Sequence, residues 1–253
     1  MTEPTSPARK PLSPAIIGLI GVVGGMLGTV IMGFGLVPMP HGATDKVVHE
    51  YILTHPEILP EAMENLRTRE TGKLLDAVRG PLETPWPGAI IGNPNGKVTL
   101  VEFIDFACGY CKRSVADVEQ LVAANPDLKV VVRELPILSP ESADAAKMAL
   151  AAAEQGKYAA FHKAMFETGR PDSQTIAAAA QAAGLDMARA AKTIADPRAQ
   201  AEIERNVGLA RQLGINGTPS WVAGNHMLSG AVGVAELSKV LEEAREEAGS
   251  AKK

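Results

Sequence analysis

The hydrophobic residues gather first in one long uncharged run near the N-terminus. The run extends from Ile16 to Val37, and no charged side chain lies between Lys10 and Asp45. A helix of these twenty-two residues would be roughly 33 Å long, and the hydrocarbon layer of a membrane is about 30 Å thick. The pattern predicts a single membrane-spanning anchor over 16–37. Positive charge just before such a run stays cytoplasmic, so we expect a cytoplasmic tail at 1–15 and export of the remainder.

A cleaved signal peptide is the alternative interpretation of the same run. Signal peptides have a shorter apolar stretch, of about 7 to 15 residues, that ends at small residues near the cleavage site. His41-Gly42-Ala43 fits such a site poorly, which favours the uncleaved anchor. Both interpretations place the rest of the chain in the periplasm or another extracytoplasmic space, where disulfides persist.

Apolar residues then recur at helical spacing through residues 44–79. They predict a helical arm of two amphipathic helices that meet between Thr54 and Glu57, because Pro56 is tolerated only in a first helical turn. The apolar positions are Val47, Val48, Tyr51, Ile52, Ile58, Leu59, Met63 and Leu66. Residues 80–96 contain four prolines, which is typical of a linker.

The pattern changes again at residue 97. Continuous β-formers predict buried strands at 97–105 and 128–134, with a helix at 114–124 between them. An alanine-rich stretch from 140 to about 213 predicts three or four helices. Two short strands around a Gly-Asn turn and a closing helix follow, at 220–223, 226–229 and 234–247. We therefore expect an α/β domain at 97–247 in the order β-α-β, helical insertion, β-β-α, with a flexible tail at 248–253.

Composition narrows the function. The 25 Lys and Arg residues are balanced by 29 Asp and Glu, for a formal net charge of -4, and no basic stripe is interleaved with aromatic residues. A phosphate backbone needs such a stripe, so nucleic acid is not an expected partner. Aromatic residues make up only 4% of the chain, which favours an aliphatic core of helices packed on a small sheet.

The two cysteines of the chain stand three residues apart, in Cys108-Gly109-Tyr110-Cys111. They fall where a buried strand ends and a helix begins, and the free N–H groups of a helix start favour a thiolate. A thiolate is the species that attacks a disulfide. Cys108, at the helix tip, is predicted to be exposed and to act as the nucleophile. Cys111, one turn into the helix, is predicted to be shielded and to resolve the mixed disulfide.

Three other interpretations of the pair stay open. The cysteines could form a structural disulfide or two inert thiols, or the fold could be a binding module without chemistry. They could also form half of a zinc site or a linear Cu(I) site. No second cysteine pair exists, and the five histidines show no ligand spacing, so we predict no resident metal.

Three sequence features resemble the DsbA-like thioredoxin-fold proteins. Glu102-Phe103 lies six residues before the Cys-x-x-Cys motif, and Gly217-Thr218-Pro219 precedes the final hairpin. The segment from Gly92 to Lys112 and the arm motif at 55–62 are similar to the Com1/ScsC-type branch of that family. The resemblance covers about residues 45–247. It implies a thioredoxin fold with an inserted helical subdomain, here preceded by the predicted membrane helix and arm.

The resemblance also implies roles for individual residues. Pro219 would be cis and lie against the active-site disulfide, and the backbone of Thr218 would pair with the bound client chain. Glu102 would be a buried acid that takes a proton from Cys111, which a raised pKa would suit. Asp105 is the rival acid, expected at a strand end in solvent. His162 is expected to serve packing or the surface.

Gly109 and Tyr110 form the active-site dipeptide. Strongly oxidising members carry histidine where this chain has Tyr110, which brings no positive charge, and Thr218 resembles the isomerase-type members. Both features predict a milder disulfide.

Together these features predict an exported, membrane-tethered enzyme that forms or isomerises disulfides in secreted proteins. Its partners would be unfolded or misoxidised clients and a membrane redox protein, and the arm at 44–79 would support a homo-oligomer. No cofactor is needed beyond the Cys108–Cys111 disulfide. Oxidase and isomerase both stay open, and a tethered chaperone or copper-handling protein that uses the cysteines as ligands is the alternative.

Overall fold

The structure is a computed structural model that describes residues 41–250. The predicted cytoplasmic tail and membrane anchor lie outside these residues. Within residues 41–250, no helix is both long and apolar enough to cross a membrane. The described residues fall into two compact units, which divide between Met63 and Glu64.

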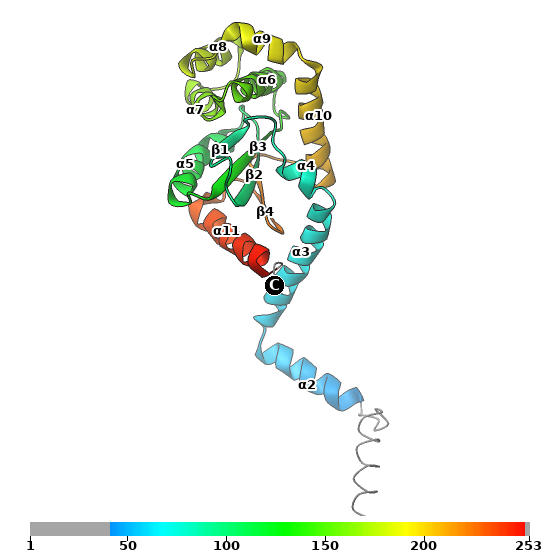
Figure 1. Cartoon of the computed structure of the whole chain (residues 1–253). Helices are drawn as coiled ribbons and strands as arrows, with labels where there is room; N and C mark the ends of the chain where they lie inside the picture. Colours follow the sequence, from blue (N-terminus) through cyan, green and yellow to red (C-terminus); the bar gives the residue numbers. More distant parts are fainter. Residues whose placement is uncertain (1–40, 251–253) are drawn as a thin grey trace, which may run out of the picture. The chain divides into compact units, whose positions relative to one another are not determined.

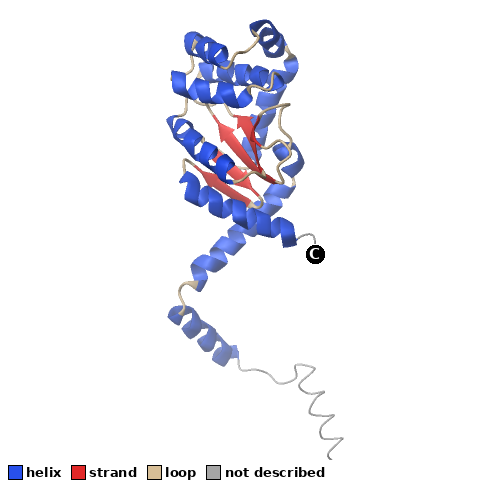
Figure 2. Cartoon of the chain, turned by 60° about the vertical axis from the view of Figure 1, so that its left-hand side comes forward, coloured by secondary structure: helices blue, strands red, loops and turns tan. Residues whose placement is uncertain are grey.

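A five-stranded sheet forms the centre of the second unit (Figure 2). Its order is β1-β3-β2-β4-β5, in which β2 and β3 are parallel and the other neighbours are antiparallel. The strands are β1 (Ile90–Gly92), β2 (Val98–Ile104), β3 (Leu128–Glu134), β4 (Ser220–Ala223) and β5 (His226–Ser229). The predicted β-α-β and β-β-α units are confirmed, and β1 is an additional strand within the segment predicted as a linker.

Helices cover both faces of this sheet (Figure 1). One face packs against α5 (Gly109–Ala124) and α11 (Gly233–Ser250), and the other packs against α4 (Arg79–Glu83) and α10 (Pro197–Gln212). Side chains alternate along β2 because successive residues of a strand point to opposite faces. Leu100 and Ile104 therefore enter the core under α5, and Val101 and Phe103 enter the core under α10.

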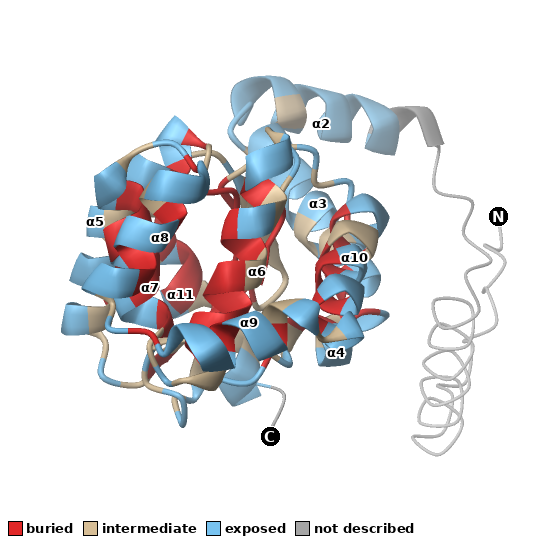
Figure 3. Cartoon of the chain, turned by 90° about the horizontal axis from the view of Figure 1, so that it is seen from above, coloured by how far each residue is buried: buried red, intermediate tan, exposed pale blue. Residues whose placement is uncertain are grey.

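The helical insertion contains five helices, where three or four were predicted. The additional break is at Gly156, whose φ of 69° lies in the left-handed region that glycine adopts without strain. Figure 3 shows the buried residues of α6 and α7 facing the interior. The five are α6 (Pro140–Glu154), α7 (Tyr158–Thr168), α8 (Ser173–Ala182), α9 (Met187–Ala195) and α10.

The arm residues form α2 (His41–Thr54) and α3 (Ile58–Asp76), which meet at the predicted boundary. Residues 44–54 of α2 are exposed apart from Ile52, which is half-buried (Figure 3). The end of α3 is different, because Leu75 is fully buried in the core that contains Val101 and Phe103. The second unit thus begins well before residue 97 and includes α4 and β1.

Arg133 anchors this N-terminal extension. It lies on β3 with 1% exposure and points away from the face that carries α5. Its guanidinium donates to Glu202 Oε1 of α10 at 2.6 Å and to the carbonyl oxygens of Leu82, Thr84 and Pro81. One buried cation therefore joins α4, the sheet and α10.

Candidate active site

Cys108 is the N-cap residue of α5, at the point where the chain turns from β2 into the helix. Its Sγ accepts a long hydrogen bond of 3.5 Å from the backbone N–H of Cys111. Both cysteines are free thiols in this structure. One backbone N–H of the first helical turn, that of Cys111, thus points at the Cys108 sulfur.

Asp105 fixes the turn that delivers Cys108. Its carboxylate accepts hydrogen bonds of 2.8 Å from the backbone N–H groups of Ala107, Ile137 and Leu138. The side chain is only 1% exposed, so the prediction that it lies in solvent was wrong. The error arose because the chain after β3 returns over the end of β2 and buries Asp105. With three backbone donors, this carboxylate holds the active-site loop in place.

The two thiols differ less in exposure than the sequence predicted. Cys108 is 6% exposed and Cys111 is 1% exposed. Cys108 is covered because the loop before β4 lies over it, and the Cys108 thiol donates to the carbonyl oxygen of Thr218 at 3.1 Å. The expectation of an exposed Cys108 was therefore wrong, whereas the shielding of Cys111 is confirmed.

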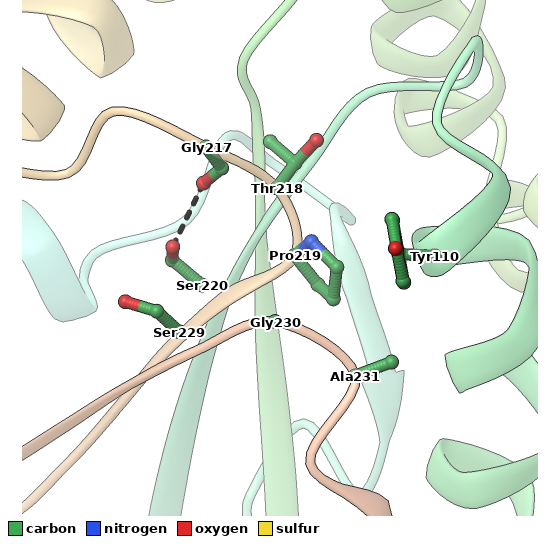
Figure 4. A pocket seen from close by; sticks show the side chains of 8 residues that line it. All are labelled: Tyr110, Gly217, Thr218, Pro219, Ser220, Ser229, Gly230 and Ala231. Atoms are coloured by element: carbon green, nitrogen blue, oxygen red, sulfur yellow. Dashed lines mark hydrogen bonds between the residues drawn. The ribbon is translucent and has the colours of Figure 1, made fainter.

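The Thr218–Pro219 peptide bond is cis, as the resemblance implied. Beside it is an open pocket of about 270 Å³ in which Tyr110 stands opposite Pro219 (Figure 4). Its lining is mostly apolar and comes from α5, the loop into β4 with the first residue of that strand, and the last residue of β5 with the chain after it. The lining residues are Tyr110, Gly217, Thr218, Pro219, Ser220, Ser229, Gly230 and Ala231. The pocket therefore adjoins the residue whose carbonyl oxygen contacts the Cys108 thiol.

Tyr110 is 57% exposed, and the Arg113 guanidinium lies 4.4 Å from the centre of its ring. Such a cation over an aromatic face is an attractive contact. Tyr110 itself brings no charge, as predicted, but a positive charge reaches the rim of the pocket from one turn further along α5. Gly109 is exposed beside it.

Glu102 lies beneath the cysteines with 2% exposure. Burial raises the pKa of its carboxyl well above the ordinary value, and repulsion from Glu134 raises it further. Its Oε2 has no hydrogen-bond partner among the described residues. Burial also raises the pKa of the Cys111 thiol, the Asp105 backbone lowers it, and nearby Glu102 raises it again. A buried thiol and a buried acid thus influence each other's protonation.

Three further titratable groups lie behind Glu102, and the sequence did not assign them to the site. The Tyr158 hydroxyl donates to Glu134 Oε1 at 2.6 Å. Burial raises the pKa of Glu134 to about 8. Burial lowers the pKa of His162 to about 4, and its ring packs against Phe106 and Phe166, as the packing interpretation predicted. The sequence signal for Glu134 was its position at the end of the valine-rich segment that predicts a buried strand.

Metal ligands do not gather near the cysteines in the part of the chain that the structure describes. Residues 41–250 contain no group of three or more His, Cys, Asp or Glu side chains arranged to hold a metal ion. Two thiols at this spacing can still form a two-coordinate site for a soft cation such as Cu(I).

Two family models match the chain. Residues 99–242 match the DSBA-like thioredoxin domain, and residues 45–71 match the copper resistance protein ScsC N-terminal domain. The first match contains both cysteines and Pro219. The second covers most of α2 and the first part of α3.

Solved structures of thioredoxin-like and ScsC proteins are also similar to this chain. A thioredoxin-like oxidoreductase from Silicibacter pomeroyi DSS-3 is 40% identical, with a TM-score of 0.60 over 62% of this chain and 91% of that one. The thiol-disulfide exchange protein alpha-DsbA2 from Wolbachia pipientis is 28% identical, with a TM-score of 0.64 over 70% and 97%. Proteus mirabilis ScsC in a transitional conformation is 26% identical, with a TM-score of 0.63 over 82% and 97%.

Curated relatives include a Na(+)/H(+) antiporter NhaA 3 from Salinispora tropica, 30% identical over 168 residues. The match covers 64% of this chain and 24% of the antiporter. The chain thus spans about a quarter of the length of the curated relatives it matches, so the similarity concerns one part of those proteins.

Proposed function

This chain belongs to the DSBA-like thioredoxin family of thiol-disulfide oxidoreductases, and we propose that it exchanges disulfides with exported client proteins through Cys108 and Cys111. The observation that carries the proposal is the meeting of three parts at one point. Cys108 caps α5, and Cys111 is buried behind it. The carbonyl oxygen of Thr218, which precedes a cis proline, accepts a hydrogen bond from the Cys108 thiol.

The reaction follows from these positions. A client thiolate attacks Cys108 Sγ, the Cys108–Cys111 bond breaks, and its electron pair remains on Cys111. A second client thiolate then attacks the client sulfur of the mixed disulfide, which forms the client disulfide and releases Cys108 as a thiolate. In the opposite direction the dithiol enzyme opens a wrong client disulfide, and Cys111 displaces the client from Cys108.

Glu102 serves the proton transfer in this scheme. In the resolving step it accepts the proton of the Cys111 thiol, and in the client-oxidising direction it returns one to the Cys111 thiolate. A buried carboxyl with a raised pKa suits both steps near neutral pH. Support for this role comes from its burial beneath Cys111 and its free Oε2.

The client binds in the pocket beside the cis proline. An apolar client side chain packs between Tyr110 and Pro219, and the client backbone pairs with Thr218. Tyr110 and Thr218 also favour a milder disulfide than that of the strong oxidases, and the same site supports both formation and isomerisation of client disulfides. A membrane redox protein would set the oxidation state of the pair, and the arm would support self-association.

Two activity assays test the exchange function, namely reduction of insulin and refolding of a protein with scrambled disulfides. Cys108→Ala should abolish both, because no nucleophile remains. Cys111→Ala should leave the first attack intact and accumulate a mixed disulfide with the client. If Cys108→Ala leaves both rates unchanged, the proposed exchange function is wrong.

Copper handling is the second candidate, favoured by the match of residues 45–71 to the N-terminal domain of a copper resistance protein. In this alternative the thiolates of Cys108 and Cys111 ligate Cu(I). Titration of the reduced chain with Cu(I) under anaerobic conditions tests it. Binding that is lost on alkylation, in a chain without exchange activity, would favour this alternative over the first.

A further inference from the structure

A second buried carboxyl lies next to Glu102 on the same face of the sheet. In the parallel pair of β2 and β3, Glu102 is opposite Val132 and Ile104 is opposite Glu134. Residues two positions apart on a strand share a face, so Glu102 and Glu134 are diagonal neighbours. Glu102 is 2% exposed and Glu134 is 1% exposed. The two acids therefore share one interior region under Cys111.

No basic side chain neutralises this pair. Neither carboxyl forms an ion pair within residues 41–250. Arg133 precedes Glu134 in sequence but lies on the opposite face, bound to Glu202. Two carboxylates without a counter-cation in a low-dielectric interior cannot both be charged at modest energetic cost, so the pair carries at most one negative charge near neutral pH.

The other titratable groups around the pair leave this balance in place. Cys111 approaches from α5, Asp105 from the end of β2, and Tyr158 and His162 from α7. His162 is neutral near pH 7, because burial lowers its pKa to about 4. Asp105 accepts three backbone N–H groups, and its proximity raises the pKa of Glu134.

Hydrogen bonding decides which acid of the pair holds the charge. Glu134 Oε1 accepts the Tyr158 hydroxyl at 2.6 Å, and such a donor favours the ionised carboxylate. Glu102 Oε2 is buried without any partner among the described residues. As the pH rises and the pair loses one proton, near the Glu134 pKa of about 8, the negative charge therefore settles on Glu134, and the remaining proton settles on Glu102, the acid that influences Cys111.

We propose that Glu134, held by Tyr158, is a positioning residue that keeps the shared proton on Glu102, next to Cys111. The proposal deepens the proposed exchange function and rests on it. When a client thiolate opens the enzyme disulfide, the Cys108–Cys111 bond breaks and its electrons go to Cys111 Sγ. The proton then moves from Glu102 to that sulfur, and the negative charge that arrived on the client ends on Glu102. Solvent returns the proton afterwards.

The test is the pH profile of disulfide opening by dithiothreitol, with rates corrected for the thiolate fraction of the reagent. The wild-type rate should fall at high pH as Glu102 loses its proton. Glu134→Gln keeps an acceptor for Tyr158 but removes the charge that repels ionisation of Glu102. The falling limb should then move to lower pH by about one unit, which lowers the rate on the limb about tenfold.

Tyr158→Phe tests the same proposal in the same pH profile with a variant that keeps both carboxyls. Without the hydroxyl donor, Glu134 keeps its own proton to higher pH, so the limb should move in the same direction by a smaller amount. Glu102→Gln should remove the limb. Glu119→Gln, which deletes an exposed charge on α5, is the matched control and should leave the profile unchanged.

The outcomes separate the inference from the proposed function. A profile that stays unmoved in folded Glu134→Gln or in Tyr158→Phe overturns the role of Glu134, even if exchange activity is intact. A wild-type disulfide that dithiothreitol opens but that never exchanges with insulin or another client defeats the proposed function instead.

Discussion

At the scale of single residues, the buried carboxyls connect the chemistry of the site to the stability of the fold. Glu102 and Glu134 hold their protons more tightly in the folded chain than in the unfolded chain, since burial raises both pKa values. The stabilisation is complete below the ordinary value of 4.5 and is lost as the pH rises toward the folded value, about 8 for Glu134. The raised pKa values that suit these carboxyls to proton transfer therefore lower the free energy of unfolding at neutral pH.

The first prediction concerns the window from pH 6.5 to 8. Below 6.5 the unfolded chain also binds a proton at His162, which changes stability in the opposite direction. Within the window, the free energy of unfolding should fall by about 2 kcal/mol as Glu134 approaches its folded pKa of about 8, and Glu102 changes stability in the same direction. Glu134→Gln should remove the part of the fall that Glu134 contributes. Urea unfolding of the reduced protein at the two pH values measures it, and equal slopes for wild type and variant would contradict the prediction.

The same residues show what the sequence could and could not reveal. Cys108 and Cys111 stand in a local motif, so their roles could be predicted from the sequence, and the resemblance added Pro219 and Glu102. Asp105, Glu134 and Tyr158 have no such motif. Their burial depends on where α7 and the chain after β3 pack, and a single sequence does not encode that packing locally.

At the scale of elements, the hydrophobic periodicity predicted the longer strands and the helix junction correctly. It missed a short strand and could not show which part of the chain α3 packs against. The strands β2 and β3 and the junction of α2 with α3 lie where the pattern predicted them. The strand β1 has only three residues and lies in a proline-rich segment, so no period could be measured. The pattern in α3 also could not show that Leu75 packs into the second unit, because a hydrophobic stripe does not identify its partner.

The second prediction concerns Arg133, which joins three elements across the sheet. Arg133→Met should lower the free energy of unfolding by about 3 to 5 kcal/mol, because Glu202 then loses its buried cation and keeps only Arg205, whose side chain is 57% exposed. Changing Glu202 to Met as well should recover part of the loss. Urea unfolding measures both.

Arg245→Met is the matched control. Arg245 pairs with Asp127 and Glu242 at the surface, where such pairs contribute about 1 kcal/mol or less. If Arg133→Met cost no more than this control, the anchoring role of Arg133 would be refuted.

At the scale of the whole molecule, the unit before residue 64 carries apolar side chains that the described structure leaves exposed. Val47 is 67% exposed, Tyr51 is 54% exposed and Met63 is 71% exposed. An apolar stripe at helical spacing is typical of a surface that packs against another helix. A second copy of the chain is the partner that we propose for it.

The third prediction follows from this surface. Met63→Glu should convert an oligomer of the full chain to a monomer in analytical ultracentrifugation, since a charge would have to be buried between copies. Refolding of scrambled disulfides should fall severalfold, because one client no longer meets several sites, while insulin reduction should persist. Glu61→Gln, an exposed polar change on the same helix, is the control. A wild-type chain that sediments as a monomer would exclude the proposed assembly.

A fourth prediction returns to the contact between the Cys108 thiol and the carbonyl oxygen of Thr218. A cysteine-free peptide should bind the disulfide form of the chain about fivefold more tightly than the dithiol form, the difference made by about one hydrogen bond. Isothermal titration calorimetry of the two forms measures it, and equal affinities would show that the carbonyl does not take part.

The reason for this difference is that a disulfide sulfur carries no hydrogen. Once Cys108 is oxidised, the Thr218 carbonyl has lost its donor and is free to accept an N–H from an incoming chain. When the exchange returns the thiol, the enzyme occupies that acceptor again and competes with the chain it has just served. In the oxidising direction, the disulfide form of the enzyme therefore holds the client chain, and the dithiol form that the reaction leaves behind releases it.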